Sequence, residues 1–297
     1  MPTAGQLVDN IVSELHGYGN TADRVTSLAA PIAPGDTTFT VTDASGQAVG
    51  LSPGVVEIDS ELLYAKTVDQ ATGIVTLASG FGRGYKGTTA ASHATGVPVV
   101  SQPKFPRSSI LKTINQVIGA VAPDIFSVQT ETMTVTYPSN TYTPVVPRGL
   151  SVLDVQWQHP IGDWLPIFSY GVDPFDGKLR LGSLPSAIAI GRPLRVVWAG
   201  EPTLFSTEAD DFVTVTGLPV TCSDVIELGV LARMVPGLDI SRAQLTSVEQ
   251  SDRSRVVPPN AGINVGKYLM SEFMDRLKNE SITQRRQYPP RMRRRFS

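Results

Sequence analysis

The chain has a single cysteine, Cys222, among its 297 residues. A single cysteine excludes an intrachain disulfide and any metal site built from several thiolates, and we expect Cys222 to be a small buried apolar group. No run of about eighteen apolar residues occurs, which predicts that no helix spans a membrane. The first residues lack the basic start and unbroken apolar segment of a signal peptide, so we expect a protein that is not secreted.

Motifs for catalysis and metal binding are also scarce. The histidines His16, His93 and His159 are far apart, and none has a metal-binding spacing such as H-E-x-x-H. A G-x-S-x-G nucleophile elbow is absent. Asp210 and Asp211 stand in a turn-like context, where aspartate bonds to local backbone. We therefore predict no catalytic residue, no metal site and no cofactor in a protein that is not an enzyme.

A glycine-rich segment that follows a predicted strand has the glycine spacing of a dinucleotide site. Gly82, Gly84 and Gly87 match the G-x-G-x-x-G pattern of a dinucleotide site. The context argues against that site, because residues 88–95 are too short and polar for a crossover helix. In addition, no acid that could hold a ribose occurs between Asp69 and Asp124. We interpret the segment as glycine-rich turns within an antiparallel module.

The same acid-free interval carries a predicted basic face, formed by Arg83, Lys86, Lys104 and Arg107. A solvated charged surface is the interpretation we favour. Docking of a protein, or contact with nucleic acid through the neighbouring aromatic residues, remains open as an alternative.

Apolar residues at helical spacing predict four helices, at residues 3–17, 108–122, 223–235 and 262–286. Thr3 with Gln6 fits a capping box, Ser108 is expected to cap the second helix, and Thr221 or Ser223 the third. Helices of this length depend on packing of their apolar faces. The residues expected to pack together are Leu7, Ile11, Leu15, Ile114, Val117, Ile118, Leu228, Leu231, Leu269, Phe273 and Leu277.

Strand-like segments with β-branched residues and Gly, Pro and Asp turns fill the two long intervals between these helices. The expected fold class is α+β, with a four-helix adaptor-like hub, two inserted antiparallel β domains and an extended C-terminal arm. The expected parts are residues 1–22 (first helix), 23–102 (first β module), 103–124 (second helix), 125–218 (second β domain, a sandwich or small barrel), 219–284 (third and fourth helices with their connection) and 285–297 (basic arm).

The predicted arm contains six arginines and no acid. Without these six, 19 basic groups face 27 acidic groups, so the rest of the chain has a formal charge of −8. A basic tail can bind nucleic acid, but Tyr288, Met292 and Phe296 recur every four residues, which favours a protein interface. The residues expected to dock are Arg285, Arg286, Tyr288, Arg291, Met292, Arg293, Arg294, Arg295 and Phe296.

Two features resemble proteins of long-tailed bacteriophages. Ile58, Asp59 and Glu61 (I-D-x-E), followed by the segment from Arg83 to Gly96 (R-G-x-x-G-T-x-A-x-x-H-x-x-G), are similar to a small β module that recurs in phage virion proteins. The four expected helices with their basic arm resemble the head-to-tail connector, or portal adaptor.

This resemblance implies a structural virion protein in the head-tail neck, assembled in the host cytoplasm. It implies a twelvefold ring of identical subunits that binds the portal protein on one side and a neck, stopper or tail protein on the other. DNA would only pass through its channel, and no membrane is involved. Simple adaptors are mainly helical, so the two β domains would need a role of their own, such as contacting the capsid.

Two alternatives stay open. The chain could be another neck or tail protein, such as a stopper or baseplate component. It could also bind carbohydrate on a cell surface, with Trp157, Trp164 and Trp198 as sugar platforms, although strand-like apolar surroundings favour a core position for these tryptophans.

Overall fold

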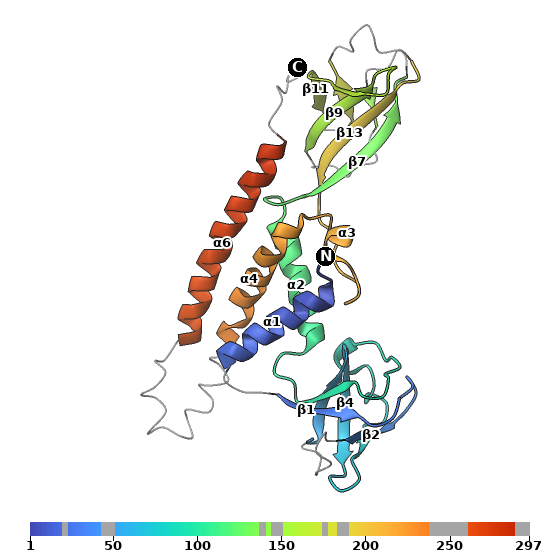
Figure 1. Cartoon of the computed structure of the whole chain (residues 1–297), viewed down its shortest axis with the longest axis vertical. Coiled ribbons are helices and arrows are strands. Elements are labelled where there is room, and N and C mark those ends of the chain that lie inside the picture. The colour runs from blue at the N-terminus through green and yellow to red at the C-terminus, as the bar shows by residue number, and fades with distance from the viewer. Residues whose placement is uncertain are drawn as a thin grey trace.

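A computed structural model describes residues 1–19, 23–42, 51–136, 141–143, 151–173, 178–182, 190–237 and 261–288. Three parts follow one another along the long axis of the molecule (Figure 1): a small β-barrel, a layer of helices, and a pair of β-sheets. None of the described helices is long and apolar enough to cross a membrane.

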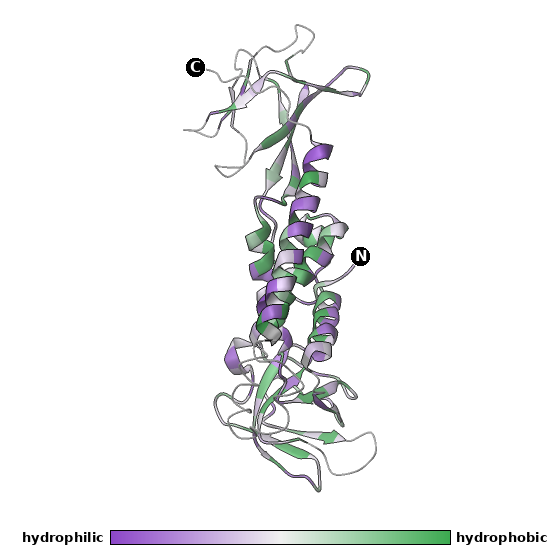
Figure 2. Ribbon diagram, turned by 90° about the vertical axis from the view of Figure 1, so that its left-hand side faces the viewer, coloured by the Kyte–Doolittle hydropathy of each residue, from purple (hydrophilic) through white to green (hydrophobic). Residues whose placement is uncertain are grey.

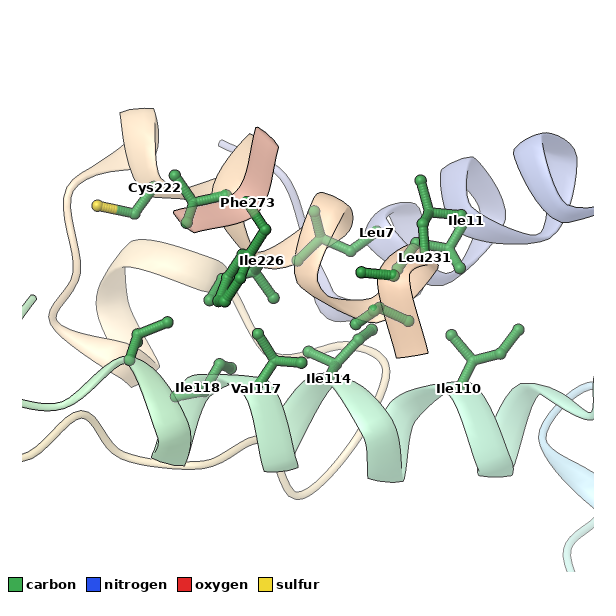
Figure 3. Packing of buried hydrophobic residues seen from close by; sticks show 14 of the residues in the cluster. Leu7, Ile11, Ile110, Ile114, Val117, Ile118, Cys222, Ile226, Leu231 and Phe273 are labelled. Carbon is green, nitrogen blue, oxygen red and sulfur yellow. The ribbon is translucent and has the colours of Figure 1, made fainter. Parts of the chain in front are cut away.

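The helical layer is built from five α-helices of the described chain and one short 3-10 helix. They are α1 (Ala4–Gly19), α2 (Arg107–Val121), α3 (Phe212–Thr216), η2 (Val220–Cys222), α4 (Ser223–Met234) and α6 (Ala261–Gln287). Side chains from α1, α2, α4 and α6 share one apolar cluster, which Phe105, Phe205 and Phe212 extend. In Figure 3, residues from these four helices point toward one another. Each fully buried Leu or Ile contributes roughly 2 kcal/mol to stability.

The barrel is closed and antiparallel, with neighbouring strands in the order β1-β2-β5-β4-β3-β6. Its strands are β1 (Arg24–Leu28), β2 (Thr38–Thr42), β3 (Gly54–Ile58), β4 (Glu61–Val68), β5 (Ile74–Leu77) and β6 (Pro98–Ser101), and the short helix η1 (Tyr85–Gly87) lies in the loop between β5 and β6. Closure depends on β6, which pairs with both β1 and β3. The barrel has its own apolar core.

The third part consists of a four-stranded and a three-stranded sheet, ordered β10-β9-β13-β7 and β11-β12-β8. The strands are β7 (Ser127–Thr134), β8 (Thr141–Tyr142), β9 (Val152–Gln158), β10 (Trp164–Pro166), β11 (Tyr170–Val172), β12 (Leu179–Leu181) and β13 (Pro193–Gly200). Both sheets contribute to one core, in which Tyr142 and Leu179 of the small sheet meet Val155 and Val196 of the large one.

The predicted fold class is wrong in its central feature, the four-helix adaptor-like hub. The structure has five α-helices in its described part, together with a closed six-stranded barrel and two further sheets. Only the coarser description as a mixed α and β protein is compatible with it. One physical reason is α3, whose Val and Thr residues have strand propensity. Asp211 caps this helix by accepting from Thr214 N, and Gly217 (φ 68°) ends it.

The predicted helix caps have mixed outcomes. The capping box is confirmed, because Thr3 N donates to Gln6 Oε1 (2.9 Å) and Gln6 N donates to Thr3 Oγ1 (3.2 Å). Ser108 does not cap α2, since the N-cap position is Pro106. The cap predicted for the third helix is also wrong: Cys222 occupies the N-cap of α4 without a side-chain bond. In α2, a side chain from another part of the chain replaces the local cap, as described below.

Candidate functional site

Four residues of the barrel converge next to the β3–β4 turn, although they are up to 34 positions apart. The tight turn between β3 and β4 carries Asp59, whose φ of 52° is in the left-handed region, and Glu61 follows it. The loop after β5 supplies Arg83, and the loop before β6 supplies His93. Their side chains form one network of hydrogen bonds and ion pairs.

Glu61 is the centre of this network and is 1% exposed. Its carboxylate accepts hydrogen bonds from Arg83 Nε (2.8 Å), from the Arg83 guanidinium NH2 group (2.9 Å), from Gly84 N (2.9 Å) and from Ala91 N (3.0 Å). Burial alone would raise the pKa of Glu61, but the bonds from Arg83 and the backbone outweigh burial and lower the pKa to about 2. Glu61 is therefore ionised at neutral pH, and both of its carboxylate oxygens accept hydrogen bonds.

His93 links Glu61 to Asp59 and is itself buried, with 4% of its surface exposed. Its Nδ1 lies 2.6 Å from Asp59 Oδ2, and its Nε2 lies 2.9 Å from Glu61 Oε2. Because ionised carboxylates only accept hydrogen bonds, both contacts are satisfied when both ring nitrogens carry protons. The network of Asp59, Glu61, Arg83 and His93 is then electrically neutral.

The glycine-rich segment is the loop that this network fixes. Gly84 (φ 59°) donates to Glu61, and an added Cβ there would lie 2.7 Å from the Thr88 carbonyl oxygen. Arg83 also donates to the carbonyl oxygens of Ala33 and Ala91. The loop is thus held on both sides of η1 by the side chains of Glu61 and Arg83.

Chemically, this arrangement is a structural clamp. Glu61 is satisfied by Arg83, His93 and backbone N–H groups, and Asp59, which is half-exposed, holds the other ring nitrogen of His93. Within the described residues, no group of three His, Cys, Asp or Glu side chains could hold a metal ion.

A second junction joins the barrel to the helical layer. Glu57 of β3 is 4% exposed, and its Oε1 accepts from the backbone N–H of Arg107 (2.7 Å), the first residue of α2. Burial raises the pKa of Glu57 to about 7, more than the Arg107 contacts lower it. The Arg107 guanidinium pairs in turn with Glu208 (2.7 Å) and with Asp9 of α1. One arginine therefore ties α1, α2 and the segment before α3 together.

The predicted basic face is not a single surface. Arg83 is paired inside the barrel and Arg107 is paired at the junction, where their side chains are 11% and 25% exposed. Lys86 and Lys104 are exposed and lie beside the rings of Tyr85 and Phe105. Half of the predicted basic charge is thus neutralised within the fold, a pairing that spacing alone did not reveal.

The predicted packing residues lie in the helical core. Ten of them are buried there, and Leu228 is partly buried against it. Cys222 is confirmed as a buried thiol, and burial, with a contribution from Glu280, raises its pKa to about 12. In Figure 3 it lies at the margin of the cluster.

The end of α6, where the predicted arm begins, is fixed to the segment just before β7. Gln284 is buried near the end of α6, and its side chain accepts from Phe126 N (3.1 Å) and donates to Phe126 O (2.6 Å). Arg285 lies 3.6 Å from Asp124. Arg286 is exposed, and Tyr288 is the last described residue. The remaining predicted docking residues, Arg291, Met292, Arg293, Arg294, Arg295 and Phe296, lie outside the described residues.

The tryptophans do not form a sugar platform. Trp157 and Trp198 are buried, as the strand-like sequence favoured. Trp164 is partly buried, and the guanidinium of Arg195 covers its ring at 3.8 Å from the centroid.

The main feature that sequence reasoning missed is the pairing of Asp59 and His93 with Glu61 and Arg83. The only available signal was that all four occur in one spaced motif. In comparisons with known proteins, no family model matches this chain, and no curated protein matches it.

Proposed function

We propose that this chain is a structural virion protein, a head-to-tail adaptor that forms a ring between the portal and the neck or tail of a long-tailed bacteriophage. The observation that carries the proposal is the convergence of Asp59, Glu61, Arg83 and His93 in one network around the buried Glu61 and His93. These are residues on which the resemblance to a virion β module rests. Their mutual contacts give a physical reason for the spacing of the motif.

The position of α6 also supports the proposal. This helix runs along the helical layer toward the sheet pair (Figure 1), and Gln284 fixes its final turn to the start of β7. The arginine-rich residues 288–297 therefore start from a defined point beside the sheets. In the proposal, these residues bind an acidic surface of the portal, with arginines selecting the charge and Tyr288, Met292 and Phe296 filling apolar recesses.

A truncation tests this role directly. Removing residues 288–297 leaves α6 with its Gln284 bonds, so we expect a folded protein with an unchanged helical signal in circular dichroism. We expect it to lose binding to purified portal rings, measured by co-sedimentation and by electron microscopy of the mixture.

A matched variant separates charge from shape. Replacing Arg291, Arg293, Arg294 and Arg295 by glutamine keeps length and polarity but removes four charges, and we expect binding at least about tenfold weaker. Undiminished portal binding by the truncated chain would contradict the proposed docking role. Binding to a tail or neck protein instead of the portal would favour the stopper or baseplate alternative.

A further inference from the structure

The longest helix, α6, is packed on one side only. Leu269, Phe273 and Leu277 are buried against the helical core. Contact with α4 is close: a Cβ at Gly229 of α4 would lie 2.8 Å from the ring of Phe273, and one at Gly266 of α6 would lie 2.5 Å from Pro236. At 1.5 Å per residue the helix is about 40 Å long, so a long outer face is left exposed.

This outer face has a regular stripe of exposed residues. Their spacings of four, three, four, four and three residues place them on one side of the helix. The outer stripe consists of Lys267, Ser271, Met274, Lys278, Ile282 and Arg285. Met274 and Ile282 are large apolar residues that are 54% and 41% exposed. Figure 2 views the molecule from this side and shows hydrophobic positions between hydrophilic ones on α6.

The exposed charge on α6 is mainly positive. Its exposed basic residues are Lys267, Arg276, Lys278, Arg285 and Arg286, whereas its one exposed acid among the described residues is Asp275. Arg276 pairs with Asp224, and Arg285 pairs with Asp124. In the described part of the chain, Lys267 and Lys278 have no ion-pair partner within the fold.

An opposite charge lies along α1. Gln6, Asp9, Asn10, Ser13 and Glu14 are exposed at spacings that place them on one side of this helix. Asp9 is already paired with Arg107, so the negative charge of this side comes mainly from Glu14. Glu227 of α4 adjoins this edge and accepts a bond from Asn10 (3.1 Å). Burial raises the pKa of Glu227, and the like charges of Glu14 and Asp224 raise it further. A cation docked at this α1 edge would relieve that repulsion.

The two segments that flank α6 in the sequence do not match the charge of the outer stripe. Residues 238–260 carry three acids and three arginines, and residues 289–297 carry four arginines and no acid. Neither segment supplies a net negative charge. The α1 edge of a second copy of the chain does supply a net negative charge.

We propose that the outer stripe of α6 docks on the α1 edge of a second copy of this chain. Because the two surfaces differ, the contact is heterologous: each copy uses α6 toward one neighbour and α1 toward the other, which builds a ring or an open filament. Only the closure into a ring rests on the proposed adaptor function. Lys267 and Lys278 face Glu14 and Glu227 of the neighbouring copy, and Met274 and Ile282 add apolar contact area.

Charge exchange tests this contact in the full-length chain. One variant carries Lys267→Glu and Lys278→Glu, and the other carries Ser13→Lys and Glu14→Lys. We expect each variant alone to self-associate about tenfold or more weakly than the wild type in sedimentation velocity, since like charges then face each other. An equimolar mixture should restore association, because each altered surface then meets a complementary one.

The control for the first variant carries Lys66→Glu on the barrel and Lys112→Glu on α2, which changes the net charge by the same amount. We expect this control to associate like the wild type. Restored association in the mixture excludes misfolding as the cause. A wild type that stays monomeric at all concentrations, or variants that associate normally, would overturn the inference. Portal binding is measured separately, so rings that ignore the portal would contradict only the proposed function.

Discussion

The barrel and the helical layer differ in what they bury. In the barrel, Glu61 and Arg83 form an ion pair at 2.8 Å in which Glu61 is 1% exposed. The imidazole ring of His93 is buried next to this pair. In the helical layer, the corresponding positions are filled by apolar side chains such as Ile114 and Ile118. All charged side chains that are buried in the described residues belong to the two β parts.

This difference predicts two kinds of response to substitution. An apolar core loses stability in proportion to the volume removed, because dispersion contacts and burial are summed over many atoms. A buried ionic network depends on completeness, because a partner left without its counter-charge bears the full desolvation penalty. The stability of the barrel should therefore depend on single polar atoms of the network, and the stability of the helical layer on the side-chain volume that a substitution removes.

The largest expected effect follows from Glu61→Gln. The substitution nearly conserves volume but leaves the buried Arg83 without its counter-charge, and one face of the amide now opposes N–H donors. We expect the barrel to lose about 4 kcal/mol of stability. Hydrogen exchange of amides in β3, β4 and β6 measures this loss locally, because exchange reports the free energy of opening.

Asp59→Asn is the matched control for Glu61→Gln. The Asp59 side chain is 54% exposed and can be solvated when its bond to His93 is weakened, so we expect a loss of about 1 kcal/mol or less. Equal losses in the two variants would contradict the view that burial at Glu61 dominates the network.

A smaller effect is expected from shortening Ile114, which is fully buried on α2. Ile114→Ala should lower the free energy of unfolding by about 3 kcal/mol, and Ile114→Val by about 1 kcal/mol. Denaturant unfolding followed by the helical circular dichroism signal measures both. If Ile114→Val were as damaging as Ile114→Ala, the helical core would not respond by volume and the contrast with the barrel would fail.

The same contrast explains what could be predicted from the sequence. Apolar periodicity located the segments that become α1, α2, α4 and α6, because a stripe at helical spacing has one physical meaning. It did not reveal α3, where Val213 and Val215 alternate with threonines as in a strand and a local cap decides the outcome. It also did not reveal barrel closure, which depends on β6 pairing with strands far away in the sequence.

The network was out of reach for a related reason. Which acid pairs with which base depends on how loops return to the same point, and Arg83 and Arg107 look alike in sequence. Arg83 forms an ion pair with Glu61 in the barrel. Arg107 pairs with Glu208 and Asp9 at the junction with the helices. Charge counts along the chain predicted a basic face, and these pairings neutralise half of its charge.

A pH-dependent effect distinguishes two carboxylates of the same β3–β4 hairpin. The pKa of Glu57 is raised to about 7 in the folded protein, against an ordinary value of 4.5, so its protonated form is favoured by folding. Stability from this group is fully present below pH 4.5 and is lost as the pH rises through 7. Glu61 acts in the opposite way: its pKa is lowered to about 2, so its stabilisation is present above pH 4.5 and is lost as the pH falls toward 2.

Denaturant unfolding of the wild type and of Glu57→Gln at several pH values tests this sign. The glutamine retains an oxygen for the Arg107 N–H but cannot ionise. We expect the variant to gain on the wild type by about 3 kcal/mol between pH 4.5 and 8. If the difference between the two proteins is constant over that range, Glu57 does not ionise at the junction. If the wild type gains instead, the Arg107 contacts outweigh burial, and this junction would behave like the Glu61 network.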